Sequence, residues 1–455
     1  MKRVVSWRLH RVISRGRVGR PRLLLNTSRR YIPTRTHDIM TTISFVILLL
    51  CFKQTLLEDP PCVIDLECSV CLPENMPLVT SHRVANGSVR VTSGSDVALS
   101  CGSSGKFVVY PHRHALAASC ERGRYRVHDD HELRHLLELG CQESIFEDVL
   151  HQVDECLPPL HGRAYRMPES NPRLVRRHLA TVCFDHERGV AVRLRMSNEA
   201  PAQPTNLQTP TRPAIVQTPL SMLGNIHQIL YVKMRHEAEK LYSDEARMNK
   251  RLRELFKHDK YSFAVQTLTS AKLLSGQYFE DQYMRVTNFV SNKVAVWRSV
   301  ARGNLLHVHR DVAKLLRQAR ARAELHVYSG THGVLALRAG RARTELFLTA
   351  DGRYPVPRYV WSVVHAPALH KALALVVLND PFVAVSEIRQ VVFCQSECGT
   401  VSWLHELRRH RNYEVPLYGL VFCCTLDNFT SIVTEMTTKL NVFQGNEGML
   451  TEFSF

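Results

Sequence analysis

The sequence lacks a hydrophobic run long enough to cross a bilayer comfortably, because a spanning helix needs about 20 apolar residues. The longest run, residues 41–52 (TTISFVILLLCF), is shorter and has the length of the apolar part of a secretory signal peptide. Met40 stands directly before it. We therefore expect residues 1–39 to be a basic extension absent from the mature protein and residues 40–58 to be a signal peptide. The mature protein is then secreted and not membrane-bound. If the basic arm is translated, a signal anchor or a targeting arm is the alternative.

The sequence also lacks internal repeats, and no second cysteine pair follows Cys68 and Cys71 at a spacing typical of zinc sites. Thirteen cysteines are present, and removal of Cys51 with the signal peptide leaves twelve. Secreted domains oxidise such even sets into disulfides, whereas cytosolic proteins rarely do. We expect disulfides rather than zinc, with the pairing left open. The disulfide candidates near the C-terminus are Cys394, Cys398, Cys423 and Cys424.

Most of the chain beyond the N-terminal arm carries little excess charge. The net charge is +17, and residues 1–39 hold eleven Lys or Arg against Asp38, which leaves about +7 for the rest. The segment from Arg302 to Arg343 contains nine basic residues and only two acidic ones, Asp311 and Glu324, so it carries this excess positive charge. The location of the charge therefore matters more than its sum.

Three regions follow the signal peptide. Residues 59–198 hold eight cysteines and short alternating runs at 88–92 and 106–110, which predict a disulfide-rich, β-rich domain with one helical segment at 131–139. Residues 199–220 contain five prolines and predict a linker. Residues 221–455 predict a helix over 226–257, strands at 261–265 and 283–290, a helix from Leu305, and then strands at 325–328, 334–337, 345–348, 360–364 and 372–378. This order is α+β.

Several segments resemble one family in the same order. The stretch NKVAVWRSVARGN from Asn292 to Asn304 resembles the metal-site segment of the DNA/RNA non-specific endonucleases, the ββα-metal nucleases, in their secreted animal branch. That segment reads Asn-x-x-Pro-Gln-x-x-x-x-Asn-x-x-x-Trp in the family. The segments at 325–334, 354–364 and 378–382, together with the C-terminal cysteines, are similar to later family segments. The likeness covers residues 60–430, and Asn292 and Trp297 are the retained positions.

The resemblance implies a ββα-metal-type α+β fold with a mixed or antiparallel sheet, and Mg²⁺-dependent hydrolysis of nucleic acid. In the family, a His acts as general base, an Asn holds Mg²⁺ and a Glu holds a metal-bound water. Here the three matched positions are Thr267, Ala301 and His309. Alanine offers no oxygen to a hard cation. The resemblance therefore implies a nuclease-like pseudoenzyme whose catalytic set is lost.

Histidines near the motif offer a route to a rebuilt site. His258, His307 and His309 are bases suited to neutral pH, and softer metals accept imidazole. Asn304 and His309 are the weak metal candidates. We expect these histidines to be solvated residues on the helix surface, and Asn304 to be a capping residue, since Asn is common at the start of helices.

The helix from Leu305 is expected to carry a basic face. This face predicts either weak, non-specific binding of DNA or RNA by phosphate neutralisation, which needs no catalytic residue, or an ordinary solvated charged surface. Its residues are Arg302, Arg310, Lys314, Arg317 and Arg320. Trp297 and Tyr283 lie in apolar runs and are expected in the core. The alternatives to a nucleic-acid-binding pseudoenzyme are an active extracellular nuclease with relocated residues and a protein-binding scaffold.

Overall fold

A computed structural model describes residues 59–66, 68, 71–82, 87–102, 105–151, 156–167, 177–198, 221–256, 266–320, 322–339, 342–410, 413–436 and 448–453. The expected N-terminal extension, signal peptide and linker lie outside these residues, as do His258 and the strand expected at 261–265. Among the helices of the described residues, none has the length and apolar character needed to span a membrane.

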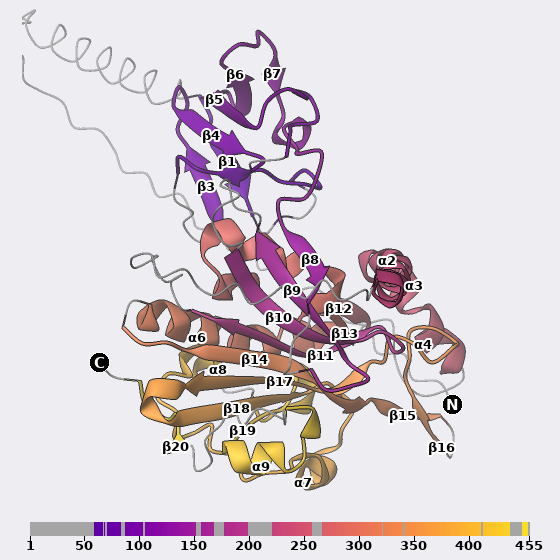
Figure 1. Ribbon diagram of the computed structural model, residues 1–455. Coiled ribbons are helices and arrows are strands. Elements are labelled where there is room, and N and C mark those ends of the chain that lie inside the picture. The colour runs from indigo at the N-terminus through magenta and orange to yellow at the C-terminus, as the bar shows by residue number, and fades with distance from the viewer. Residues whose placement is uncertain are drawn as a thin grey trace, which may run out of the picture. The chain divides into compact units, whose positions relative to one another are not determined.

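The central element is a nine-stranded sheet whose strands come from distant parts of the chain (Figure 1). The order is β19-β18-β17-β14-β11-β10-β9-β8, with antiparallel neighbours throughout, and β20 pairs with β18 in parallel. The strands are β8 (Glu147–Leu150), β9 (His161–Met167), β10 (Arg177–Asp185), β11 (Val190–Ser197), β14 (His326–Val334), β17 (Pro357–Ala366), β18 (Lys371–Leu378), β19 (Val421–Cys424) and β20 (Gly448–Met449).

The sheet crosses the domain boundary expected at residue 198. β11 pairs with β14, with Met196 opposite Val327. Residues 59–455 accordingly form one compact unit. The expectation of a separate domain over 59–198 is wrong for its second half, because β8–β11 share a sheet with strands that begin at His326. A boundary drawn from composition does not reveal such long-range pairing.

The first half of the cysteine-rich region forms two small sheets of its own. β1 (Cys62–Asp65) pairs with β3 (Ser88–Val91), and a five-stranded sheet contains β2 (Leu78–Val79), β4 (Asp96–Ser100), β5 (Ala115–Glu121), β6 (Arg124–Val127) and β7 (Leu133–Arg134). The strand expected at 106–110 is reduced to a single bridge between Phe107 and Cys141. The helical segment expected at 131–139 is β7 followed by the 3-10 turn η1 (Leu136–Glu138).

The disulfide expectation is confirmed. Twelve cysteines form six bonds: Cys62–Cys120, Cys68–Cys71, Cys101–Cys141, Cys156–Cys183, Cys394–Cys424 and Cys398–Cys423. The last two attach the segment after β18 to strand β19.

The helix expected over 226–257 is divided into α2 (Ser221–Ser243), α3 (Glu245–Met248) and α4 (Lys250–Leu255). The Asp244 carboxylate accepts hydrogen bonds from the backbone N–H groups of Ala246 and Arg247 and so starts α3 as a new helix. A hairpin of β12 (Leu268–Lys272) and β13 (Lys293–Trp297) follows. Between its strands lie the 3-10 segments η2 (Gly276–Tyr278), η3 (Asp281–Asn288) and η4 (Val290–Asn292). The strand expected at 283–290 is therefore wrong.

The sheet is buried on both faces. Val364, Leu375 and Val377 belong to a core on one face, while Trp361 and Val376 belong to a second core on the other. Helix α6 (Asn304–Ala319) contacts β18 from one side, and α9 (Leu426–Thr430) contacts it from the opposite side (Figure 1). The architecture is α+β, as predicted.

The remaining elements are short. They are α5 (Arg298–Ala301), the hairpin of β15 (Ala336–Ala339) and β16 (Ala342–Glu345), η5 (Pro367–Leu369), η6 (Val385–Glu387), α7 (Ile388–Val391), α8 (His405–Arg409), η7 (Pro416–Tyr418) and η8 (Thr434–Met436).

Candidate functional site

The β12–β13 hairpin leads directly into α5 and α6 and positions the matched residues. Leu268 lies opposite Trp297 in the hairpin, and the N–H of Arg298 donates to the carbonyl oxygen of Thr267 at 2.8 Å. Thr267 therefore lies beside the start of α5, the helix that ends at Ala301. The local order is strand, strand, helix, and it brings together two of the three positions matched by sequence.

The retained residues Asn292 and Trp297 support this segment. Asn292 is buried; its Nδ2 donates to the carbonyls of Leu274 and Thr287, both at 2.9 Å, and its Oδ1 accepts from the N–H of Leu274 at 2.8 Å. Trp297 is fully buried and packs edge-on against Phe382 at 5.1 Å between ring centroids. Both side chains hold the backbone in place, and Trp297 and Tyr283 are core residues, as expected.

The three matched positions supply neither a carboxylate nor an accessible base. Ala301 carries a methyl group that packs against the core. Thr267 carries a hydroxyl whose buried oxygen has no hydrogen-bond partner within the described part of the chain, and the same holds for the Ser299 hydroxyl. The nearby carboxylate of Glu245 is engaged by the Arg298 guanidinium and by the Thr269 hydroxyl. Neutral hydroxyls are poor ligands for a hard divalent cation without carboxylates. These residues therefore do not fit the Mg²⁺ that the family resemblance implies.

His309 is a core residue rather than a solvated one. Its side chain is buried, and its ring stacks on Tyr278 with centroids 5.6 Å apart and planes at 15°. Burial, helped by the positive charge of Lys272, lowers the pKa of the His309 imidazole to about 4. The imidazole is then neutral at pH 7 and only weakly basic. The expectation of a solvated surface histidine is wrong here, because Tyr278 of η2 covers this face of α6.

Asn304 is bound to backbone. It is the first residue of α6, and the preceding residue, Gly303, occupies the N-cap position. The Asn304 Nδ2 donates to the carbonyl of Gly419 at 2.8 Å, and the residue is 1% exposed. Its role is therefore to join the start of α6 to the turn before β19, not to cap the helix.

Helix α6 has two faces. Its buried side includes Leu305, Val308, Val312 and Leu316. The residues of the expected basic face are all exposed: Arg302, Arg310, Lys314, Arg317 and Arg320. None of these five forms an ion pair with a carboxylate of the described residues.

The charge of the basic face is not offset by its own helix. The one acidic residue of α6, Asp311, is buried and accepts hydrogen bonds from the backbone N–H groups of Glu406 and Leu407 at 2.8 and 2.9 Å. Some cations outside α6 are paired: Arg235 lies 2.7 Å from Glu239, and Arg353 lies 2.8 Å from Glu237. The basic face is therefore an unneutralised strip on a structured helix.

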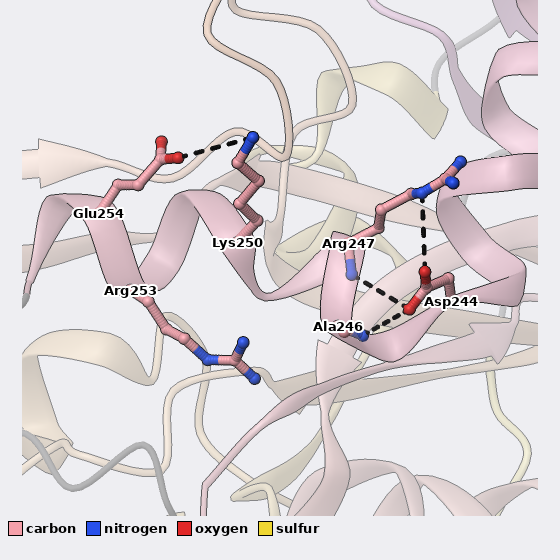
Figure 2. Close-up of a pocket in the computed structure, with 6 residues that line it drawn as sticks. All are labelled: Asp244, Ala246, Arg247, Lys250, Arg253 and Glu254. Atoms are coloured by element: carbon pink, nitrogen blue, oxygen red, sulfur yellow. Dashed lines mark hydrogen bonds and ion pairs between the residues drawn. The ribbon is translucent and has the colours of Figure 1, made fainter.

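A pocket between α3 and α4 was not anticipated from the sequence (Figure 2). Its charged side chains are of both signs: Asp244 contacts Arg247 at 3.6 Å, and Lys250 lies 4.0 Å from Glu254. Figure 2 shows Arg253 apart from these pairs. These pairs neutralise one another's charge, and the side chains that line the pocket do not bring an acid, a base or a nucleophile together.

Sequence reasoning also missed Glu406 and His410, which lie beside His307. One ligand atom from each of these three residues lies within 4.8 Å of the others. His307 is half-buried rather than solvated as expected. The spacing of Glu406 and His410, four residues apart in a helical segment, was the signal that would have identified them.

Comparisons with known proteins add little to these observations. No family model matches the chain, and no curated protein matches it in sequence. Among solved structures, the chain is similar to one in a crystal structure of the EndoG/EndoGI complex, which concerns the mechanism of EndoG inhibition. The identity is 11% and the TM-score 0.24, with 44% of this chain and 71% of that chain covered. A TM-score this low establishes neither a common fold nor a common function.

Proposed function

We propose that this protein is a secreted, nuclease-like pseudoenzyme that binds DNA or RNA weakly and without sequence preference. The observation that carries the proposal is the strip of five exposed, unneutralised cations that runs from Arg302, two residues before α6, to Arg320, the residue directly after it. Arg310, Lys314, Arg317 and Arg320 recur every three or four residues and so lie on one side of the helix. From Arg310 to Arg320 this side extends about 15 Å along the helix axis.

Such a strip is suited to a phosphate backbone. Each phosphate neutralised by a Lys or Arg releases condensed counterions, so affinity falls steeply as salt rises, whatever the base sequence. This kind of binding requires exposed cations on a fixed frame and no catalytic group. The buried face of α6 supplies the frame by packing into the core.

Loss of cleavage is supported by the same segment. At the positions matched to the family's catalytic His, metal-binding Asn and water-binding Glu, the chain has Thr267, Ala301 and His309. Only His309 titrates, and burial lowers the pKa of its imidazole to about 4. No group in this set activates a water or holds Mg²⁺. Secretion is supported by the six disulfides, since oxidising compartments favour them.

The binding proposal is tested with the full chain produced through a secretory pathway. Retention of double-stranded DNA is measured at salt concentrations from about 50 to about 200 mM. We expect the Arg317→Ala/Arg320→Ala variant to lower affinity and to reduce the slope of log K against log salt by about 2.

The matched control is Lys233→Ala/Lys240→Ala, which removes two exposed cations from α2. This variant should bind like the parent protein. If the parent shows no salt-sensitive retention, the protein is a scaffold and the proposal fails. Equal losses in both variants would mean that total charge, not the α6 strip, governs binding.

A further inference from the structure

Two helices that pack together place two imidazoles and a carboxylate side by side. His307 is on α6, Glu406 is on α8, and His410 follows the end of α8. The His307 and His410 rings stack with centroids 4.2 Å apart and planes at 18°. The His410 Nε2 lies 3.9 Å from the Glu406 carboxylate.

The segment that carries Glu406 and His410 is fixed to α6. The buried Asp311 carboxylate, four residues after His307, accepts the N–H groups of Glu406 and Leu407 at the start of α8. Leu407 is fully buried between the helices. The three side chains are therefore presented on a rigid pair of elements, as a metal site requires.

The donor set suits a borderline transition metal. Zinc is bound by imidazole nitrogen and carboxylate oxygen, and two His with one Glu is a known three-ligand set that leaves one position open. Tetrahedral ligands about 2.1 Å from zinc lie roughly 3.4 Å apart, so ligand atoms already within 4.8 Å reach it by small side-chain rotations. Mg²⁺, which prefers oxygen ligands, is disfavoured.

One ring atom of the cluster also lacks a partner. The buried Nδ1 of His307 has no hydrogen-bond partner among the described residues. Buried polar atoms normally have one. His410 is exposed while His307 and Glu406 are half-buried, so the cluster is reachable from solvent.

We propose that His307, Glu406 and His410 form a zinc site that links α6 to α8. The site differs from the position at which the endonuclease resemblance places a metal, which is Ala301. It uses neither the basic face nor nucleic acid, so it stands or falls independently of the proposed function.

The test is titration of the EDTA-treated and dialysed full chain with ZnCl₂ by calorimetry, in the absence of nucleic acid. We expect one tight site per chain, with affinity reduced at least tenfold in His410→Ala. Substitution with Co²⁺ should give the visible absorption of a tetrahedral site, and His307→Ala should abolish it.

His405→Ala is the matched control, because His405 is an exposed histidine on the same short helix and lies outside the cluster. It should bind zinc like the parent. Circular dichroism establishes that each variant is folded. Absence of a stoichiometric site, unchanged affinity in His410→Ala, or an equal loss in His405→Ala would overturn the proposal.

Discussion

His309 shows how a single position changes the chemistry of a helix. A carboxylate there would face a buried, low-dielectric environment, and a charged group is costly in such a place unless it is paired. The imidazole that is present stays neutral and stacks on Tyr278. The residue thus stabilises the contact between α6 and η2 and is not available for proton transfer.

Protonation of His309 should lower the free energy of unfolding as the pH falls. The folded-state pKa of about 4 lies below the ordinary value of 6.5, so the unfolded chain binds the proton more readily. The contribution is complete above pH 6.5 and is lost as the pH falls towards 4. Two and a half pKa units correspond to about 3 kcal/mol. We expect the free energy of unfolding of the parent to fall by this amount relative to His309→Phe between pH 7 and pH 4, as measured with urea. Parallel pH profiles for the two proteins would show that His309 does not titrate as described.

At the scale of elements, a buried polar network joins four segments. The Asp148 carboxylate on β8 accepts the Arg163 Nε of β9 at 2.7 Å, the Ser291 hydroxyl of η4 at 2.8 Å, and the Tyr231 hydroxyl of α2. The Arg163 guanidinium lies over the Tyr231 ring, 3.2 Å from its centroid. Asp148 and Arg163 side chains are 0% exposed. The network thereby links strands that precede residue 199 to helices that follow residue 220.

Removing only the Asp148 carboxylate should destabilise the fold more than removing both charges of the Asp148–Arg163 pair. Asp148→Leu leaves the Arg163 charge buried without its partner, which costs about 3–5 kcal/mol. The double variant Asp148→Leu/Arg163→Met removes both charges and should be less destabilised than the single one. Denaturant unfolding measures both. A double variant that is less stable than Asp148→Leu would contradict this account.

Elements with strong local patterns were predictable, and those fixed by distant contacts were not. The apolar spacing of Leu305, Val308, Val312 and Leu316 is local, and it correctly predicted α6 and its basic face. The segment from Tyr283 was expected to be a strand, but in the fold Asp281–Asn288 forms the 3-10 helix η3. The short β13 was missed because its sequence, KVAVW, is too brief to distinguish from the adjoining helix.

The candidate site follows the same division. The substitutions at Thr267 and Ala301 were evident from the sequence, and the structure places Thr267 beside the start of α5 and Ala301 at its end. The burial of His309 depends on Tyr278, and the cluster of His307 with Glu406 and His410 depends on the packing of α8 against α6. The four-residue spacing of Glu406 and His410 is a local signal, but their contact with His307 and the contact of His309 with Tyr278 are set by the tertiary fold.

At the scale of the whole molecule, one sheet combines strands from before and after residues 199–220, and three of the six disulfides attach peripheral segments to its strands. Within this frame, α6 contributes to the core with one face and carries unneutralised positive charge on the other. The basic face of α6 is therefore held on a packed core, while the residues at the positions matched to the family's catalytic set are neutral. This combination is the basis for the proposal that the protein binds nucleic acid without cleaving it.

The most direct test of the proposed binding without cleavage is incubation of the full chain, produced through a secretory pathway, with supercoiled plasmid and with RNA in Mg²⁺, Mn²⁺ or EDTA. A gel shift is recorded in parallel, and a His309→Ala variant is purified in the same way to reveal any contaminating nuclease. We expect intact nucleic acid in every condition and a gel shift that disappears as salt rises. Metal-dependent cleavage by the parent that is lost in His309→Ala would contradict the account and place a rebuilt catalytic site on α6.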